Sequence, residues 1–202
     1  MNSAAIMGLL TSHRIRIFTT GDLLTLTRMN SAAGTHALRR LEAQGLVMRI
    51  KRSVWINRAG SPVNPYEAVP YLRAPWPTYV SLYSALADSG AIEEIPQIVY
   101  AVSAAMPRRY KTLVADYSFH HLPIRLIWGF HPLQTGGGTY PVAEPEKAFL
   151  DLAYLALTPR SSLGLPRKRG RRWELSGGKV RSYTKRFGYP PLSRWIESEK
   201  FR

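Results

Sequence analysis

The stretch SAAGTHALRRLEAQG, residues 31–45, predicts a short amphipathic helix around which the rest of the chain can be understood. Ser31 suits the N-cap, because its hydroxyl can accept a hydrogen bond from a free backbone N–H of the first turn. Gly45 suits the position just after the helix, where a left-handed backbone disfavours residues with a Cβ. One narrow apolar stripe recurs at three- and four-residue spacing, and it comprises Gly34, Ala37, Leu38 and Leu41.

The opposite face of this helix is small at its N-terminal end and basic further along. A helix of this kind can approach the DNA major groove closely, with donors available for base edges and phosphates. The candidate DNA contacts on this face are Ser31, Ala32, Thr35, His36, Arg39 and Arg40. The alternative is an ordinary surface helix with two solvated arginines, and the flanking sequence favours the DNA-binding interpretation.

The elements on either side complete the order of a winged helix-turn-helix. A first helix is expected from Ser3 to about His13, and Thr20 is expected to cap a brief second helix. After the helix at 31–45, residues 46–50 and 54–56 predict a β-hairpin. Lys51 and Arg52 lie in its connection, where a wing can reach the DNA backbone or minor groove, so both are further candidate DNA contacts.

A boundary rich in Gly, Ser and Pro at residues 57–65 divides the chain into domains 1–62 and 63–202. The second is expected to be a small mixed α/β domain, which makes the whole chain α+β. Strands are expected at 97–103, 111–121 and 124–130, a loop at 131–138, and an extended segment at 141–143. Helices are expected from Glu144 through Leu157, at 179–187 and from Pro190, the last two packing on the middle of the chain.

Basic residues concentrate at the two ends of the chain, whose net charge is +15. Residues 1–60 hold nine Lys and Arg against two acidic residues, and residues 159–202 hold thirteen against three. The middle, with six against eight, is slightly acidic. This asymmetry favours a polyanionic partner, most often nucleic acid, over an anionic membrane surface. The C-terminal cluster of Arg167, Lys168, Arg169, Arg171 and Arg172 is therefore a candidate second DNA-contacting surface, with docking to an acidic protein as the rival interpretation.

Composition excludes several classes of protein. Hydrophobic residues make up 45% of the 202, enough for a real core, and the absence of cysteine excludes a disulfide framework and cysteine-based zinc sites. No signal peptide is recognisable, and the most apolar later run, at 148–158, is too short to span a bilayer. We expect a cytoplasmic protein without membrane contact and without a cofactor.

No arrangement of residues predicts catalysis or a metal site. His120 and His121 are adjacent in an expected strand, so they point to opposite faces and cannot share one metal ion. Lys147 is expected to pair with Asp151 one helical turn on, and the acids nearby suit a helix start, which argues against a nuclease cluster. The aromatic residues Trp76, Tyr79, Tyr83 and Trp128 are expected in the core rather than as base-stacking platforms.

Five blocks of sequence occur in an order that resembles a known family. They are FTTGDLL at 18–24, ALRRLEAQGLVMRIKRSVWI at 37–56, YVSLYSALADSGAIEEIP at 79–96, AEPEKAFLDL at 143–152 and YTKRFG at 183–188. Together they resemble the AbiEi family, the antitoxins of type IV toxin–antitoxin (abortive infection) systems. The resemblance implies an N-terminal winged helix-turn-helix that represses its own operon, commonly through inverted repeats, and a C-terminal antitoxin domain that counters a co-encoded nucleotidyltransferase-like toxin.

Three alternatives to a DNA-binding autorepressor and antitoxin remain open from the sequence. The first is a winged-helix regulator whose second domain senses a small ligand, and the second is a general nucleic-acid-binding protein. The third is a nuclease, which would require metal-dependent cleavage.

Overall fold

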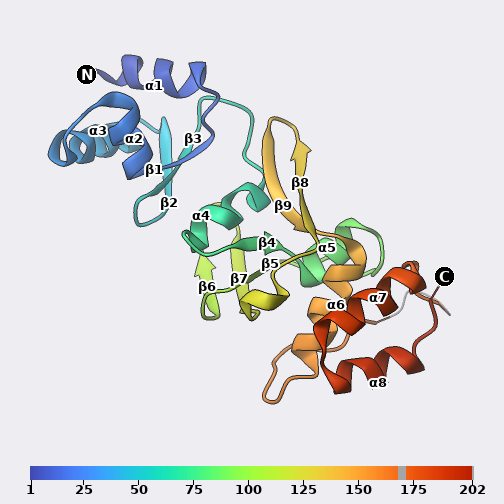
Figure 1. Ribbon diagram of the computed structural model, residues 1–202. Helices are drawn as coiled ribbons and strands as arrows, with labels where there is room; N and C mark the ends of the chain where they lie inside the picture. Colours follow the sequence, from blue (N-terminus) through green and yellow to red (C-terminus); the bar gives the residue numbers. More distant parts are fainter. Residues whose placement is uncertain (168–171, 202) are drawn as a thin grey trace.

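The computed structural model describes residues 1–167 and 172–201, and the protein is α+β (Figure 1). The N-terminal unit follows the predicted order of three helices and a hairpin, and the alternation of charged and apolar residues at 14–18, which predicts a short extended segment, coincides in part with strand β1 (Ile17–Thr19). Its elements are α1 (Ser3–Ser12), β1 (Ile17–Thr19), α2 (Thr20–Thr27), α3 (Ser31–Ala43), β2 (Val47–Lys51) and β3 (Val54–Asn57). The strands form an antiparallel sheet in the order β1-β3-β2.

Each N-terminal helix is capped one residue earlier than the sequence predicted. The caps are Asn2, Thr19 and Asn30 rather than Ser3, Thr20 and Ser31. In each case the cap side chain accepts from the backbone N–H three residues on, as Asn30 Oδ1 does from Ala33 at 2.9 Å. Thr19 also forms a capping box, because Asp22 accepts from the backbone N–H of Thr19 at 2.7 Å. The prediction that Gly45 follows the helix in a left-handed conformation is confirmed, with φ of +70°.

The second unit is built on a six-stranded mixed sheet in the order β6-β7-β5-β4-β9-β8. The pairs β4–β9 and β5–β7 are parallel and the others are antiparallel. The strands are β4 (Thr78–Val80), β5 (Val99–Ser103), β6 (Arg108–Lys111), β7 (Asp116–His121), β8 (Phe130–Thr135) and β9 (Gly138–Ala143).

The helices of this unit lie beside the sheet. They are η1 (Pro65–Ala68), α4 (Val69–Arg73), α5 (Leu82–Asp88), η2 (Ile124–Leu126), α6 (Pro145–Ala156), α7 (Gly177–Phe187) and α8 (Pro190–Ser198). The predicted helices at 144–157, 179–187 and from Pro190 are confirmed as α6, α7 and α8. Helices α5 and α6 pack against each other, and α7 and α8 pack on α6 (Figure 1). The longest helix in the described part of the chain has 13 residues, and a bilayer crossing requires about 20.

Two strand predictions were wrong between residues 108 and 138. Of the segment expected as one strand at 111–121, only Asp116–His121 forms β7, and Lys111 ends the preceding strand β6. The strand expected at 124–130 instead begins with the short helix η2 (Ile124–Leu126), and only Phe130 belongs to a strand. The loop expected at 131–138 is a β-hairpin of β8 and β9, turning at Gly136 and Gly137, whose φ angles are +53° and +113°. Strand β8 lies at the sheet edge with exposed side chains, so it lacks the apolar alternation of a half-buried strand. In this hairpin Pro132 lies opposite Pro141.

The sheet of the N-terminal unit has two buried faces, which explains how the units join. Phe18 and Trp55 pack with the three helices, whereas Ile17, Val54 and Ile56 pack into the core of the second unit. Successive residues of a strand point to opposite faces, so a three-stranded sheet can serve both cores.

Two polar contacts also join the N-terminal unit to the second unit. Arg16 forms an ion pair with Glu67, whose side chain is almost fully buried, with Nε and Oε2 2.8 Å apart. Lys51 donates from Nζ to the carbonyl oxygen of Leu72 in α4 at 3.0 Å.

Candidate functional site

Helix α3 presents a free polar face to solvent and buries the opposite one. Gly34, Ala37, Leu38 and Leu41 are buried, as the sequence predicted. A Cβ on Gly34 would collide with the side chain of Leu24 in α2, so the glycine permits close packing of the two helices. The turn between these helices is made tight by Arg28, whose φ of +54° is left-handed. The packing of α2 on α3 therefore fixes which face of α3 points outward.

The predicted contact residues of α3 lie together on this outward face. Ser31, Ala32, Thr35, His36, Arg39 and Arg40 are all exposed. In the described part of the chain, His36 and Arg39 make no hydrogen bond or ion pair, so their donors are free for a ligand. Arg40 differs, because its guanidinium donates to Ser3 Oγ at 3.1 Å and to the carbonyl oxygen of Met1 at 3.0 Å. Arg40 thus holds the start of α1 against α3.

The two predicted contacts in the hairpin have different surroundings. Lys51 is half-buried, is bonded to α4 and lies 5.6 Å from the ring centre of Tyr110. Arg52 is exposed in the turn, next to Ser53 with φ of +65°. The sequence analysis missed Arg49, which is exposed on β2, 6.0 Å from the ring centre of Trp55. The alternation of Met48, Arg49 and Ile50 was the signal that could have identified it.

The predicted C-terminal basic surface lies far from α3. Lys168, Arg169 and Arg171 fall outside the described residues, whereas Arg167 and Arg172 are exposed. Helix α7 adds exposed Arg181, Lys185 and Arg186, which the sequence analysis did not single out. Figure 1 shows α7 and α3 at opposite ends of the molecule. Among the described residues, therefore, the basic face of α3 and the basic residues of α7 do not form one continuous surface.

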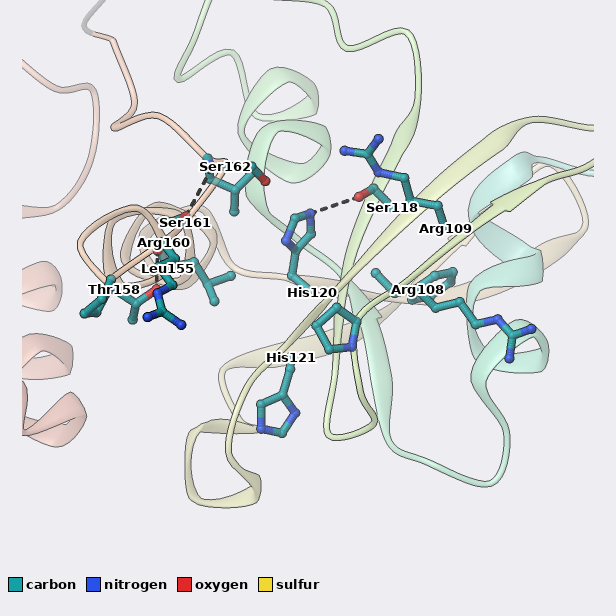
Figure 2. A pocket seen from close by; sticks show the side chains of 14 residues that line it. Arg108, Arg109, Ser118, His120, His121, Leu155, Thr158, Arg160, Ser161 and Ser162 are labelled. Carbon is teal, nitrogen blue, oxygen red and sulfur yellow. Dashed lines mark hydrogen bonds between the residues drawn. The ribbon is translucent and has the colours of Figure 1, made fainter.

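A pocket of about 450 Å³, lined by both polar and apolar groups, lies between β6, β7 and the segment that follows α6 (Figure 2). Strand β7 supplies Ser118 and His120, and β6 supplies Arg108 and Arg109. The end of α6 and residues 158–163 form the opposite wall. Figure 2 shows His120 between Ser118 and this segment, whereas His121 points away, as expected for neighbours in a strand.

His120 is held as a neutral imidazole in this pocket. Burial and the charge of Arg109 lower its pKa to about 4. Its Nε2 lies 3.0 Å from Ser118 Oγ, and its ring stacks on Tyr100 with the ring centres 6.0 Å apart. At neutral pH the side chain can therefore exchange hydrogen bonds but carries no charge.

Lys147 and Asp151 form the ion pair that the sequence predicted, but both side chains are fully buried. Asp151 Oδ2 accepts from Tyr79 Oη at 3.0 Å and from Ser81 Oγ at 2.9 Å. Lys147 Nζ donates to Tyr79 Oη at 2.8 Å and lies 4.9 Å from the ring centre of Trp128. Burial lowers the pKa of Lys147 and raises that of Asp151, while each partner opposes the shift of the other. This enclosed network fastens α6 to β4, and neither charge can reach a substrate in solution.

Four aromatic residues were predicted to lie in the core. Tyr79 and Trp128 are buried there, and Tyr83 is half-buried. The prediction was wrong for Trp76, which is 54% exposed. Trp76 lies among three prolines, in a step between α4 and β4 where no other element covers its ring.

Among residues 1–167 and 172–201, no cluster of three or more His, Asp or Glu could hold a metal ion. Comparison of the chain with protein-family models and with curated proteins gave no match.

Proposed function

We propose that this protein is a DNA-binding transcriptional repressor of its own operon and the antitoxin of a type IV system, countering a nucleotidyltransferase-like toxin. The observation that carries the DNA-binding half is the outward face of α3, with the free donors of His36 and Arg39. The antitoxin half is supported by the resemblance to the AbiEi family.

The N-terminal unit fits a winged helix-turn-helix in its element order. Helices α2 and α3 are joined by a tight turn, and β2 and β3 follow as the wing. In such a domain the second helix of the pair enters the major groove. Arg39 is suited to a guanine edge, because a guanidinium can donate to both O6 and N7. Arg52 and Arg49 on the wing are suited to phosphates, while Lys51 and Arg40 stabilise the unit itself.

The blocks that carry the family resemblance have a structural role in the second unit. YVSLYSAL supplies Tyr79 and Ser81, AEPEKAFLDL supplies Lys147 and Asp151, and these four side chains form the buried network described above. These blocks therefore build the core, and a surface that counters a toxin would lie on exposed positions outside them.

The test of the DNA-binding half compares duplexes from the region upstream of the operon with random duplexes, by fluorescence anisotropy. We expect tighter binding to the upstream DNA, and a loss of about 1–3 kcal/mol for Arg39→Ala that is confined to it. Arg181→Ala, which removes the same charge from α7 far from α3, is the matched control, and any loss of affinity that it causes should be equal for the upstream and the random duplexes. Equal affinity for both duplexes would indicate a general nucleic-acid-binding protein.

The test of the antitoxin half is growth after induction of the neighbouring toxin gene, with protein abundance checked by blot. The full chain should restore growth, and so should the Arg39→Ala variant, since DNA reading and toxin neutralisation use different surfaces. An abundant full-length chain that gives no protection would contradict the antitoxin assignment while leaving DNA binding intact.

A further inference from the structure

The pocket beside β7 has no role in the function proposed above, and its lining combines apolar surface with basic and hydroxyl side chains. In the described lining, Arg109, Ser118 and His120 lie on one face of β6 and β7, whereas Arg108 and His121 point to the other face. The facing segment adds Thr158, Arg160, Ser161 and Ser162, and none of the described lining residues carries a carboxylate. Arg109 and Arg160 form no ion pair within residues 1–167 and 172–201. The pocket thus concentrates positive charge that the protein itself does not neutralise.

The walls of the pocket are held in place by hydrogen bonds. His120 is fixed between Ser118 Oγ and the ring of Tyr100. On the opposite wall, Ser161 Oγ accepts from the backbone N–H of Leu163 at 3.1 Å. Arg160 begins this turn with φ of +63°. A site whose polar groups are already positioned loses less entropy when it binds a ligand.

Two carbonyl oxygens near the C-terminal end of α6, beside the pocket, accept side-chain hydrogen bonds. The carbonyl oxygen of Leu157 accepts from Tyr189 Oη at 3.0 Å, and that of Leu155 accepts from Thr158 Oγ1 at 2.6 Å. Carbonyl groups occupied in this way repel an incoming anion less than free ones. Apart from its histidines, the ionisable side chains in the described lining of the pocket are all arginines.

We propose that this pocket binds the phosphate group of a small molecule of about mononucleotide size. Arg109 would hold two phosphate oxygens through its planar guanidinium, as arginine does in phosphate sites. Hydroxyl groups of Ser161 and Ser162 on the facing wall, and the neutral ring of His120, supply further hydrogen bonds (Figure 2). The volume of about 450 Å³ lies in the range of small-molecule sites.

A free small molecule fits this site better than a DNA backbone does. The pocket lies beside the loop that follows α6, whereas α3 lies at the other end of the molecule (Figure 1). Its apolar groups, Leu155 and Leu163, also offer contact to a non-phosphate part of a ligand. The proposal does not depend on the repressor and antitoxin assignment, because binding here requires neither the operator nor the toxin.

The experiment is titration calorimetry of the full chain with AMP, with adenosine and with inorganic phosphate. We expect one AMP per chain and at least tenfold weaker binding of adenosine, which has the same base and sugar but no phosphate. Arg109→Gln should weaken AMP binding at least tenfold. Arg181→Gln removes the same charge from α7 and should change the affinity less than twofold. Arg160→Gln is the second variant from the facing wall, in case Arg109→Gln does not fold, as judged by circular dichroism.

Three outcomes would overturn the proposal. One is no heat of binding for AMP or phosphate at about 10 mM, a concentration at which even weak specific sites are occupied. Another is an equal loss of affinity for Arg109→Gln and Arg181→Gln, which would indicate attraction by overall charge alone. The third is displacement of AMP by a short DNA duplex but not by excess inorganic phosphate, which would assign the pocket to nucleic acid.

Discussion

Replacing Lys147 with methionine removes the cation from the enclosed pair while keeping most of its bulk. Methionine is flexible and close in length to the lysine stem, so Trp128 and Phe187 keep a packing partner. Asp151 then stays fully buried with two hydroxyl donors and no countercharge. Removing one member of a buried ion pair costs about 3–5 kcal/mol. This is a large part of the total stability of a domain, which is about 5–15 kcal/mol.

The loss of stability caused by Lys147→Met should increase with pH. Burial raises the pKa of Asp151, and Lys147 opposes that rise, so the variant should raise it further. The native state then binds more protons than the unfolded state between the unfolded pKa, about 3.9, and the native value. Stability of the variant therefore falls as the pH increases through this window. We expect a smaller difference from the unaltered chain at about pH 4.5 than at about pH 7.5.

Urea unfolding followed by tryptophan fluorescence, carried out at both pH values, measures the loss of stability and its dependence on pH. Lys179→Met is the matched control, because Lys179 pairs with Glu144 at 3.0 Å but its side chain is 38% exposed. A pair this exposed contributes less than about 1 kcal/mol after solvent screening. Should Lys147→Met alone fail to fold, the double variant with Asp151→Leu should recover stability, since an apolar pair avoids the desolvation cost. A loss for Lys147→Met no larger than the control, or one independent of pH, would refute this account of the network.

Three further predictions concern the N-terminal unit. Gly34→Ala should lower the free energy of unfolding by about 1–3 kcal/mol, because the added methyl group overpacks against Leu24. Thermal unfolding measures this loss, and fluorescence anisotropy should show weaker operator binding. An unchanged melting temperature would contradict the close packing of α2 on α3. Arg52→Ala should reduce the slope of log affinity for DNA against log salt concentration by about one. Lys51→Ala should leave this slope unchanged, because the ammonium group of Lys51 is hydrogen-bonded to α4. Equal slopes for the two variants would indicate that Lys51 contacts DNA. The isolated fragment 1–62 should bind the dye ANS more strongly than the full chain does. The reason is that the sheet face with Ile17, Val54 and Ile56, which the second unit covers in the full chain, becomes exposed. Equal ANS fluorescence would mean that the fragment exposes no apolar face.

The sequence predicted those elements whose apolar pattern is strong and local. Helix α3 follows a regular apolar stripe, so its existence and its buried face could be derived from spacing alone. Its exact start could not, since Asn30 and Ser31 are both good N-caps and the choice depends on backbone geometry. The existence of α6 was predicted as well, but its residues from Glu146 to Ala153 are buried on every side, which spacing alone does not reveal. Strand β8 was missed because an exposed edge strand shows no alternation, and its glycines suggested a loop.

The site depends on contacts between distant segments, which local patterns do not reveal. A Lys and an Asp four residues apart in a helix are typical of a solvated surface. Lys147 and Asp151 are buried because segments distant in the sequence, including α5 and α7, pack around α6. The pocket likewise requires residues 158–163 to meet β7, some forty positions earlier in the chain. By contrast, the opposite directions of His120 and His121 followed from strand geometry.

Both free edges of the six-stranded sheet are built to resist further pairing. Pro132 faces Pro141, and neither has an N–H, so this pair occupies a non-hydrogen-bonded site of the β8–β9 ladder. The nitrogen of Pro132 consequently points away from β9, and the outer rim of β8 lacks a donor there. The other rim, β6, carries the exposed charges of Arg108, Arg109 and Lys111. Proline and charge at sheet rims suppress strand addition and amyloid-like stacking. Any contact between copies of this chain should therefore proceed through side-chain surfaces, with the sheets of neighbouring copies remaining separate.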